Sequence, residues 1–261
     1  MALAKRFQRL VGIVLTVLLL GPGAARAADL GTIKVATEGT YKPFSYFNPG
    51  GELIGFDVEL IKAVCSAANI KCVVATMDYE GMIPALNAKQ IDVIAAGFAV
   101  TEKRKKVVAF TDRIRSAGRQ FVSCTPDKFS DISPTGLKGH VIGTQSGTTN
   151  ADYFQANYGG SDIRLYKSMD EAYQDLSAGR VELVLSQIGP AYSFMTSDAG
   201  KACKFVGPVL EDAKVFGNGV AFAVRQSDAE LLTALNAGIA KVIADGTYKT
   251  LNAKYVPFDL Y

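Results

Sequence analysis

Short apolar runs alternate with segments of helical periodicity along most of the chain. The clearest helical segment begins at Phe56, where apolar side chains recur at Leu60, Ile61 and Val64, the spacing of one helix face. This alternation is typical of α/β folds, in which helices connect the parallel strands of a sheet. The pattern predicts strands at 33–37, 73–76, 91–95, 141–144 and 183–186, and helices at 56–68, 82–88, 150–158, 169–178, 229–245 and 247–255.

One helix-to-strand pattern occurs twice. Residues 85–93 and 175–183 both read as a helix end, a tight basic turn and an apolar strand with one acid near its start. Residues 36–40, the end of the first predicted strand and its loop, likewise resemble residues 143–149. Such short repeats also arise by chance. If they are genuine, they predict two lobes of one α/β design, with the strand-end loops of both lobes around a single cleft.

The first 27 residues have the pattern of an export signal. A basic stretch at 5–9 precedes an apolar run at 10–20, and residues 25–27 (Ala-Arg-Ala) form a small-x-small cleavage site. The apolar run is short for a membrane span, and no later segment is long and apolar enough for one. Because residue 28 is Ala and not Cys, no lipid anchor is expected. We predict cleavage after Ala27 and release into the periplasm.

Removal of this leader changes the charge balance. The full chain has 28 Lys and Arg against 25 Asp and Glu. The leader holds four of the bases and no acid, which leaves 24 bases and 25 acids in the mature chain. This nearly neutral balance gives no reason to expect binding to nucleic acid or to a membrane surface.

The four cysteines are expected to meet an oxidising compartment, where an even number favours disulfides. Cys65 and Cys72 flank a short span between a predicted helix and the next strand, which suits a local disulfide. Cys124 and Cys203 would form the second pair, although the sequence does not settle whether they are bonded. Metal binding is the alternative, but the chain has no Cys-x-x-Cys spacing and its one histidine is His140.

Residues 91–106 read as a buried strand, a group of small residues and a basic segment. Small side chains at 95–97 let backbone N–H groups approach a ligand closely. Arg104 follows, and an arginine can bind a carboxylate through two parallel hydrogen bonds. Open α/β sheets bind ligands at the carboxyl ends of their strands. The segment therefore predicts an anion-binding edge, with a buried strand and a solvated basic turn as the alternative.

Further motifs carry a family resemblance. They are Thr-Tyr-Lys-Pro-Phe (40–44), Gly-Glu-Leu-Ile-Gly-Phe-Asp-Val-Glu-Leu (51–60), Met-Ile-Pro-Ala-Leu (82–86), Val-Thr-Glu-Lys-Arg (100–104), Phe-Thr-Asp (110–112), Gly-Thr-Thr (147–149) and Asp-Gly-Thr-Tyr (245–248). Together they resemble the periplasmic solute-binding proteins of family 3, most closely the lysine/arginine/ornithine- and histidine-binding group. The Cys65–Cys72 spacing also matches that group's disulfide. The resemblance covers essentially the whole mature chain.

That resemblance implies an α/β class II periplasmic binding protein fold, with two doubly wound lobes joined by a two-strand hinge. Lobe I would be residues 28–117 plus 220–261 and lobe II residues 118–219, with the hinge near Ala117 and Val220. The protein would be the monomeric binding component of an ABC importer, with no metal or other cofactor. It would close around a polar or basic amino acid, or a derivative of one, and present it to an inner-membrane permease.

The resemblance also implies which residues bind the ligand. Arg104 would bind the α-carboxylate, with help from the backbone amide of Ala99. Thr149 would add a contact from the other lobe at the start of a helix, where the dipole favours an anion. Its alternative role is a helix N-cap. Tyr41 and Tyr79 would stack on the ligand's side chain, unless they are ordinary half-buried packing.

Glu38 takes the position of an acid that meets a cationic ligand side chain in this family, and a surface carboxylate is its alternative. The family's ligands for the α-ammonium, hydroxyls on one strand end and an aspartate in lobe II, are replaced here by Gly97, Ala99 and Gln187. An unpartnered buried ammonium is costly. Either another group such as Glu38 binds it, or the ligand has no primary ammonium.

The second possibility resembles the opine-binding branch of the family, whose ligands carry a substituted secondary amine. Small residues at Ala96, Gly97 and Ala99 would make room for the substituent. Thr148 is a further predicted ligand-binding residue. A sugar-like group or second carboxylate would accept or donate hydrogen bonds with a set of polar residues. That polar set is Gln145, Ser146, Ser186 and Gln187.

An enzyme on the same fold, similar to cyclohexadienyl dehydratase, is the alternative function. It would need a positioned general acid or base in the cleft. The sequence offers only Glu38, Tyr41 and Tyr79 for that role, with no cleft histidine or cysteine. We therefore predict a binding protein and not an enzyme.

Overall fold

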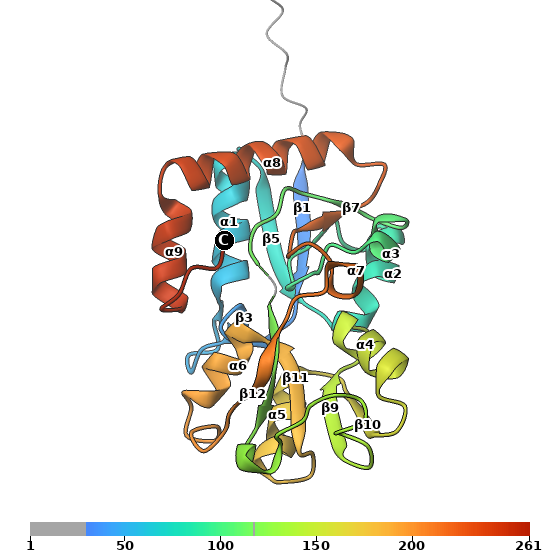
Figure 1. Cartoon of the computed structure of the whole chain (residues 1–261). Helices are drawn as coiled ribbons and strands as arrows, with labels where there is room; N and C mark the ends of the chain where they lie inside the picture. Colours follow the sequence, from blue (N-terminus) through green and yellow to red (C-terminus); the bar gives the residue numbers. More distant parts are fainter. Residues whose placement is uncertain (1–29, 117) are drawn as a thin grey trace, which may run out of the picture.

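Two five-stranded sheets, each with helices packed against it, form two lobes that lie one above the other (Figure 1). The computed structural model describes residues 30–116 and 118–261. The predicted signal peptide at 1–27 lies outside these residues. In the part of the chain that is described, no helix is both long and apolar enough to cross a membrane. The predicted two-lobed α/β fold is confirmed.

The first lobe is built on a mixed sheet. The second strand in spatial order has a parallel neighbour on each side, and two short antiparallel strands complete the sheet. In spatial order the strands are β5 (Lys71–Thr76), β1 (Thr32–Thr37), β6 (Val93–Ile94), β13 (Ala223–Val224) and β7 (Ala109–Phe110). A small antiparallel sheet contains β2 (Thr40–Tyr41), β3 (Ser45–Phe47) and β4 (Leu53–Ile54).

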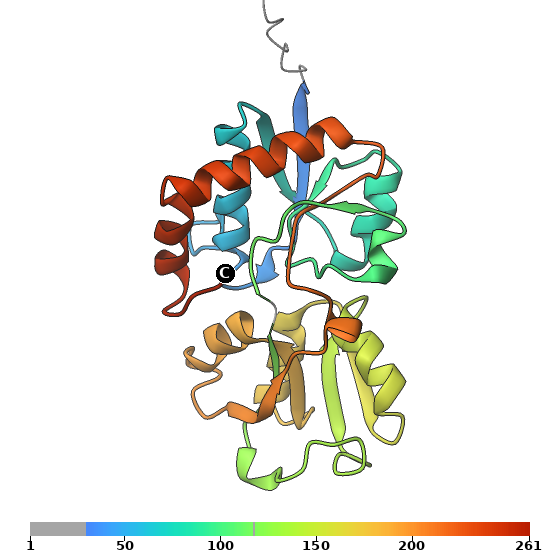
Figure 2. The same cartoon turned by 45° about the horizontal axis from the view of Figure 1, so that its top comes forward.

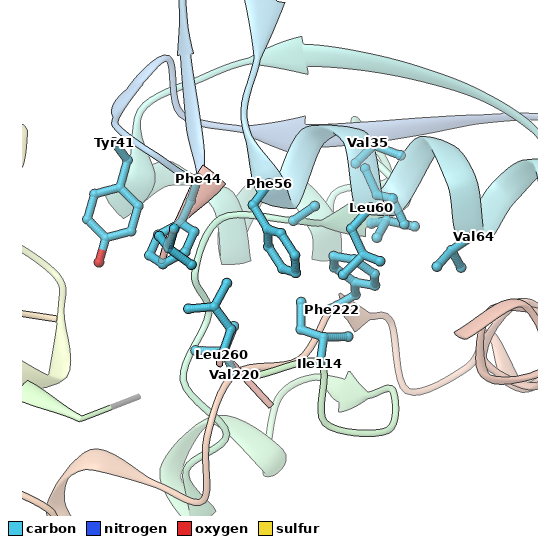
Figure 3. Packing of buried hydrophobic residues seen from close by; sticks show 14 of the residues in the cluster. Val35, Tyr41, Phe44, Phe56, Leu60, Val64, Ile114, Val220, Phe222 and Leu260 are labelled. Atoms are coloured by element: carbon cyan, nitrogen blue, oxygen red, sulfur yellow. The ribbon is translucent and has the colours of Figure 1, made fainter. Parts of the chain in front are cut away.

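The core of this lobe forms where helices pack on each other and on the sheet. Helix α1 buries the predicted face, and Figure 3 shows Phe56, Leu60 and Val64 directed toward side chains from the C-terminal part of the chain. A Cβ at Gly238 would lie 2.5 Å from the Val64 carbonyl oxygen, so glycine permits close packing of α1 on α8. The helices are α1 (Phe56–Ala67), α2 (Met82–Asn87), α3 (Glu102–Lys105), α8 (Ala229–Ala244) and α9 (Thr247–Tyr255).

The second lobe repeats this plan. The second strand in spatial order again has a parallel neighbour on each side, and the last two strands pair antiparallel. The order is β10 (Asp162–Tyr166), β9 (Val141–Gln145), β11 (Leu183–Gln187), β8 (Arg119–Ser123) and β12 (Lys204–Leu210). Its helices are α4 (Thr149–Asn157), α5 (Met169–Ser177), α6 (Ile188–Met195) and α7 (Ala213–Phe216).

The repeat predicted from the sequence is the same helix–turn–strand unit in both lobes. It connects α2 to β6 in the first lobe and α5 to β11 in the second. The turns have matching hydrogen bonds: the Gln90 amide donates to the Ala85 carbonyl at 2.9 Å, and the Arg180 amide to the Asp175 carbonyl at 2.8 Å. Each turn also has one residue of positive φ at the same position, Lys89 in one copy and Gly179 in the other.

Two segments run side by side between the lobes, one from β7 to β8 and one from β12 to β13 (Figure 2). Val220, on the second segment, forms antiparallel bridges with both Ala99 and Arg115. Each lobe contains one disulfide within it, and both disulfides match the predicted pairs. They are Cys65–Cys72, between α1 and β5, and Cys124–Cys203, between the end of β8 and the start of β12.

Candidate functional site

The strand-end loops of both lobes surround a cavity of about 20 Å³. Because the carboxyl ends of the parallel strands of each sheet face the other lobe, the loops after β1 and β6 meet those after β9 and β11. Ten of the twelve predicted ligand residues line this cavity. They are Glu38, Tyr41, Tyr79, Ala96, Gly97 and Ala99 from one lobe, and Gln145, Thr148, Thr149 and Gln187 from the other.

Hydrogen bonds cross the cleft and hold the lobes together in a closed arrangement. Gln145 Nε2 donates to Glu38 Oε1 at 2.5 Å, and Arg104 Nη2 donates to the Gly147 carbonyl at 3.2 Å. Two ion pairs at the rim add to these contacts. They join Lys103 to Asp152 at 3.2 Å and Lys167 to Asp78 at 3.1 Å.

Glu38 is buried, with 4% of its surface exposed, so the alternative of a surface carboxylate is wrong. Burial raises its pKa from 4.5 to about 7, and the hydrogen bond from Gln145 opposes this only in part. Within residues 30–116 and 118–261, Glu38 Oε2 has no hydrogen-bond partner. The carboxylate is therefore a buried acceptor that titrates near neutral pH.

Arg104 lies directly behind the cavity wall and does not line it. Its guanidinium donates to the Ala99 carbonyl at 3.3 Å and to the Tyr79 hydroxyl at 3.1 Å, and it lies 3.9 Å from the centroid of the Phe98 ring. Arg104 is buried while its basic neighbours Lys103, Lys105 and Lys106 are exposed, so the solvated basic turn describes the lysines and not the arginine. Its predicted contact with a ligand carboxylate stays a prediction.

Arg119 is a cavity residue that the sequence analysis missed. Strand β8 runs antiparallel to β11, with Arg119 opposite Gln187, so the first residue of β8 lies at the edge where β11 ends. Arg119 is 2% exposed, and its Nη2 donates to Thr149 Oγ1 at 3.1 Å and to the Phe216 carbonyl at 3.4 Å. Burial lowers its pKa to about 10, which leaves it cationic at neutral pH.

The side chain of Gln187, at the end of β11 in the second lobe, is held by two groups of the first lobe. Its Oε1 accepts from Arg115 Nη1 at 2.8 Å, and its Nε2 donates to the Gly97 carbonyl at 3.3 Å. Arg115 in turn pairs with Asp57, whose Oδ2 accepts from the Gly97 amide at 2.9 Å. The amide of Gln187 therefore has protein partners at both ends while its side chain faces the cavity.

Gly97 has a structural reason to be small. Its φ is +64°, and a Cβ there would lie 3.0 Å from Tyr41 Cε1 and 3.0 Å from Arg115 Nη2. From the sequence, we expect Gly97 to make room for a ligand substituent. In the closed arrangement, Tyr41 and Arg115 already occupy that space.

Tyr41 and Tyr79 are buried beyond the half-buried packing that was the alternative. Tyr41 lies at the edge of the hydrophobic core, and its hydroxyl points away from the labelled core side chains (Figure 3). Burial raises the pKa of both hydroxyls above 10, so both tyrosines are neutral over the physiological range.

Two of the predicted polar residues lie elsewhere. Ser146 is not part of the cavity lining, and its Oγ donates to Glu80 Oε1 at 3.2 Å across the rim. Ser186 accepts from the Tyr173 hydroxyl at 2.6 Å inside the second lobe. Both serines therefore bind protein groups, because their loop and strand positions turn their hydroxyls away from the cavity.

Asn150 and Met169 complete the lining and were also missed. Asn150 Nδ2 donates to the Leu185 carbonyl at 3.1 Å, whereas its buried Oδ1 has no hydrogen-bond partner in the described parts of the chain. Asn150 directly follows Thr149 in the chain, so the prediction of Thr149 as a ligand-binding residue could have indicated Asn150 as well. The cavity lining thus includes donors from Arg119 and Thr149 and acceptors from Glu38 and Asn150.

A second cavity, of about 360 Å³, lies on the other side of Glu38. Its lining includes the acids Asp78 and Glu171 and the base Lys167. In the described residues, no cluster of His, Cys, Asp and Glu has the arrangement of a metal site.

Comparison with known proteins agrees with this architecture. Residues 33–258 match the model of the bacterial extracellular solute-binding proteins, family 3. The chain is 39% identical over 243 residues to the histidine-binding periplasmic protein of Salmonella typhimurium, covering 91% of this chain and 92% of that protein. It is 30% identical over 294 residues to the octopine-binding periplasmic protein of Rhizobium meliloti, covering 97% and 99%.

A solved structure of an ancestral arginine-binding protein bound to arginine is also similar. It matches with a TM-score of 0.79 at 33% identity, covering 87% of this chain and 99% of that one. These relatives are binding proteins and not enzymes. The family model spans both lobes and the loops around the cavity, and the chain belongs to the bacterial extracellular solute-binding proteins of family 3.

Proposed function

We propose that this solute-binding protein captures a basic or polar amino acid, or an N-substituted derivative of one, for an ABC importer. The observation that carries the proposal is the cavity between the lobes, where a buried carboxylate and a buried guanidinium line one enclosed site. A ligand that carries both a carboxylate and a protonated nitrogen complements these groups, because buried charges require charged partners.

The charged neighbours of Glu38 support a basic side chain on the ligand. Glu38 lines both the ligand cavity and the second cavity, where Asp78 and Glu171 outnumber the one base, Lys167, which pairs with Asp78. A cationic side chain that extends past Glu38 would meet these acids. The histidine-binding relative and the arginine-bound structure point to the same class of ligand.

The surroundings of the α-nitrogen support an N-substituted ligand. Gly97 and Ala99 have no hydroxyl, and both ends of the Gln187 amide are bonded to protein. A primary ammonium has three protons to place and a protonated secondary amine has two, which matches the two acceptors of the lining without a hydrogen-bond partner in the described residues, Glu38 Oε2 and Asn150 Oδ1. The octopine-binding relative supports the same kind of ligand, since octopine is an N-substituted arginine.

The protein would act by opening and closing of the lobes. We place lobe I at residues 28–117 plus 220–261 and lobe II at 118–219, with the hinge near Ala117 and Val220. Opening would break the contacts across the cleft, and a bound ligand would add contacts that exist only in the closed form. We further propose that the protein is cleaved after Ala27, acts in the periplasm as a monomer, and delivers its ligand to an inner-membrane permease.

Calorimetric titration of the purified mature chain tests this function. The panel is arginine, lysine, histidine, glutamine and the N-carboxyalkyl derivatives of arginine and lysine. We expect one ligand per chain, and mass spectrometry of the ligand recovered after incubation should show it unchanged. Absence of binding across the panel would refute the ligand class, and chemical conversion would favour the enzyme related to cyclohexadienyl dehydratase.

A further inference from the structure

We propose that the second cavity is a further subsite, which accepts a substituent on the distal side-chain nitrogen of a cationic ligand. Its ligands would then include basic amino acids that carry an alkyl group on the nitrogen at the end of the side chain. This inference rests on the proposed function and names its substrate class. It starts from Glu38, which lines both the ligand cavity and the second cavity.

The linings of the two cavities are joined by the hydrogen bonds of Gln145. Its Nε2 donates to Glu38 Oε1 at 2.5 Å and to the carbonyl of Lys167, a residue of the second cavity, at 3.1 Å. Glu38 belongs to the first lobe and Gln145 to the second, so parting of the lobes separates the two side chains. A ligand that holds the lobes slightly apart would therefore connect the two cavities beside Glu38.

The second cavity has the room that the ligand cavity lacks. The ligand cavity, of about 20 Å³, holds about one water molecule in this closed arrangement, so an amino acid requires the lobes to lie further apart. The second cavity has about 360 Å³, and Thr40, Thr76 and Asp78 in its lining are exposed, so it reaches the surface. A group on the distal nitrogen would find space there without displacing the core.

The buried carboxylate between the cavities has acceptor sites to spare. Glu38 is 4% exposed, and its Oε2 has no hydrogen-bond partner in the parts of the chain that the structure describes. A carboxylate offers about four acceptor sites, so Glu38 can accept from a side-chain cation besides the α-nitrogen of the ligand.

The charge of the second cavity favours a substituent that leaves the nitrogen cationic. Asp78 and Glu171 line the cavity with a single base, Lys167. Lys167 Nζ lies 3.1 Å from Asp78 Oδ2, but the two side chains are 65% and 67% exposed. Such an exposed pair contributes little and leaves the acids available to a ligand. An alkyl group keeps the charge of an ammonium or guanidinium, whereas an acyl group removes it.

An aromatic ring completes the lining. Phe47 is 52% exposed, and a Cβ at Gly39 would lie 2.7 Å from Phe47 Cε2 and 3.1 Å from Thr76 Cγ2. The glycine thus lets the ring lie against the backbone beside the end of β5. An alkylated cation would cover this exposed ring, and aromatic faces attract such cations.

The test adds one ethyl group to the ligand. Lysine, Nε-ethyllysine and the neutral Nε-acetyllysine form one series. Arginine, Nω-ethylarginine and its neutral urea analogue, ethylcitrulline, form the other. If only the N-carboxyalkyl derivatives of the panel bind, the same groups are placed on them. Calorimetry on the mature chain gives the dissociation constants.

In the series whose parent binds more tightly, we expect the ethyl compound to bind within about 10-fold of that parent. A closed pocket would lose about 10-fold or more for each added carbon. We expect the ethyl compound to bind at least about 10-fold more tightly than the neutral compound of the same size, because only the ethyl compound brings a charged donor to the acids.

Thr76→Trp locates the substituent. The indole would fill the second cavity from the exposed end of β5, so the ratio of the dissociation constants of ethyl compound and parent should rise at least about 10-fold. Thr32→Trp is the matched control, since Thr32 is exposed at the opposite end of the neighbouring strand β1, and it should keep the wild-type ratio. If Thr76→Trp does not fold, Thr40→Trp, from the same lining, replaces it.

The outcomes separate this inference from the proposed function. An ethyl compound that binds more than about 10-fold more weakly than its parent would overturn the subsite, as would binding of histidine or glutamine alone, and both leave the proposed function standing. A wild-type ratio that persists in the tryptophan variant would show that the substituent lies outside the second cavity. Equal binding of the ethyl and neutral compounds would overturn the cationic class. If no compound of the panel or of either series binds, the proposed function fails and the subsite with it.

Discussion

Arg115 and Asp57 form a buried ion pair at the junction of the two lobes, with 3.2 Å between Arg115 Nε and Asp57 Oδ1. Each side chain is 1% exposed. The pair also organises the cavity wall, because Asp57 accepts from the Gly97 amide and Arg115 donates to Gln187 of the second lobe. The same two residues therefore support both the fold of the first lobe and the contact between the lobes.

Removal of one partner of this pair should destabilise the protein strongly. We expect Asp57→Asn to lower the free energy of unfolding by about 3–5 kcal/mol, since it leaves the Arg115 guanidinium buried without its anion. Urea denaturation measures the change. In the matched control, Asp162→Asn removes a half-exposed pair with Arg164 and should cost less than about 1 kcal/mol. Equal losses in the two variants would contradict a structural role for the Asp57 pair.

Much of the fold could be predicted because its main elements have long apolar patterns. All five predicted strands and all six predicted helices are present, with ends that differ by at most two residues. Three of the missed strands, β7, β12 and β13, lack such a pattern. β7 and β13 have two residues each, and β12 contains Gly207 and Pro208 at an irregularity in its pairing. These strands form because neighbouring strands supply their hydrogen bonds, which single-sequence periodicity does not reveal.

The candidate site could be predicted where it depends on strand-end loops. Glu38 and Gln145 follow or end predicted parallel strands, so the direction of those strands places them at the cleft. Arg119 could not be found in this way, because it begins a strand that runs in the opposite direction. Its position follows from the antiparallel register with Gln187, a tertiary property that no local motif records.

The Arg104 guanidinium should be required for ligand binding. We expect Arg104→Ala to weaken binding of any α-carboxylate ligand at least about 100-fold, because a bidentate charged contact is lost together with the hydrogen bond to Gly147 that closes the cleft. Calorimetry measures the affinity, and circular dichroism checks that the fold is kept. Lys106→Ala, an exposed change two residues away, should bind as the wild type does. Undiminished binding by Arg104→Ala would exclude the predicted role.

The two disulfides should contribute unequally to stability. Cys124–Cys203 joins residues 79 positions apart, whereas Cys65–Cys72 spans seven. Because a longer loop loses more entropy on closure, a Cys124→Ser/Cys203→Ser double variant should lose about 4.5 kcal/mol and Cys65→Ser/Cys72→Ser about 2.5 kcal/mol. Thermal unfolding of the two variants under identical conditions measures the order. A larger loss from the short loop would contradict the entropic argument.

Glu38 should make stability depend on pH. Its pKa is about 7 in the folded protein against 4.5 in the unfolded chain, so the folded state binds the extra proton between these values. The stabilisation from the protonated acid is present below pH 4.5 and is lost as the pH rises toward 7. Its full size is about 3 kcal/mol. The unfolding free energy of wild type relative to Glu38→Gln should therefore fall between pH 5 and pH 8.

Asp170 is the comparison for this experiment, because desolvation by its surroundings also raises its pKa, to about 6, while the residue as a whole stays exposed. Its own contribution to the pH dependence is complete at a lower pH than that of Glu38. Unfolding of wild type, Glu38→Gln and Asp170→Asn is followed at several pH values. If the difference between wild type and Glu38→Gln is constant over the range, Glu38 does not titrate as its burial implies.

Restoring a hydroxyl at Gly97 should not restore the binding of a primary ammonium. Gly97→Ser places a side chain on a residue with a φ of +64° and forces a Cβ to within 3.0 Å of Tyr41 and Arg115. We expect a loss of about 1–3 kcal/mol in stability and no gain in affinity for arginine. Gly139→Ser, with a φ of +79° and no atom within 4 Å, has the backbone strain alone and should lose less. The contrary result would be a Gly97→Ser protein that is as stable as Gly139→Ser and binds arginine more tightly than the wild type. It would show that Gly97 determines which ligand is preferred and is not needed for packing in the closed lobes.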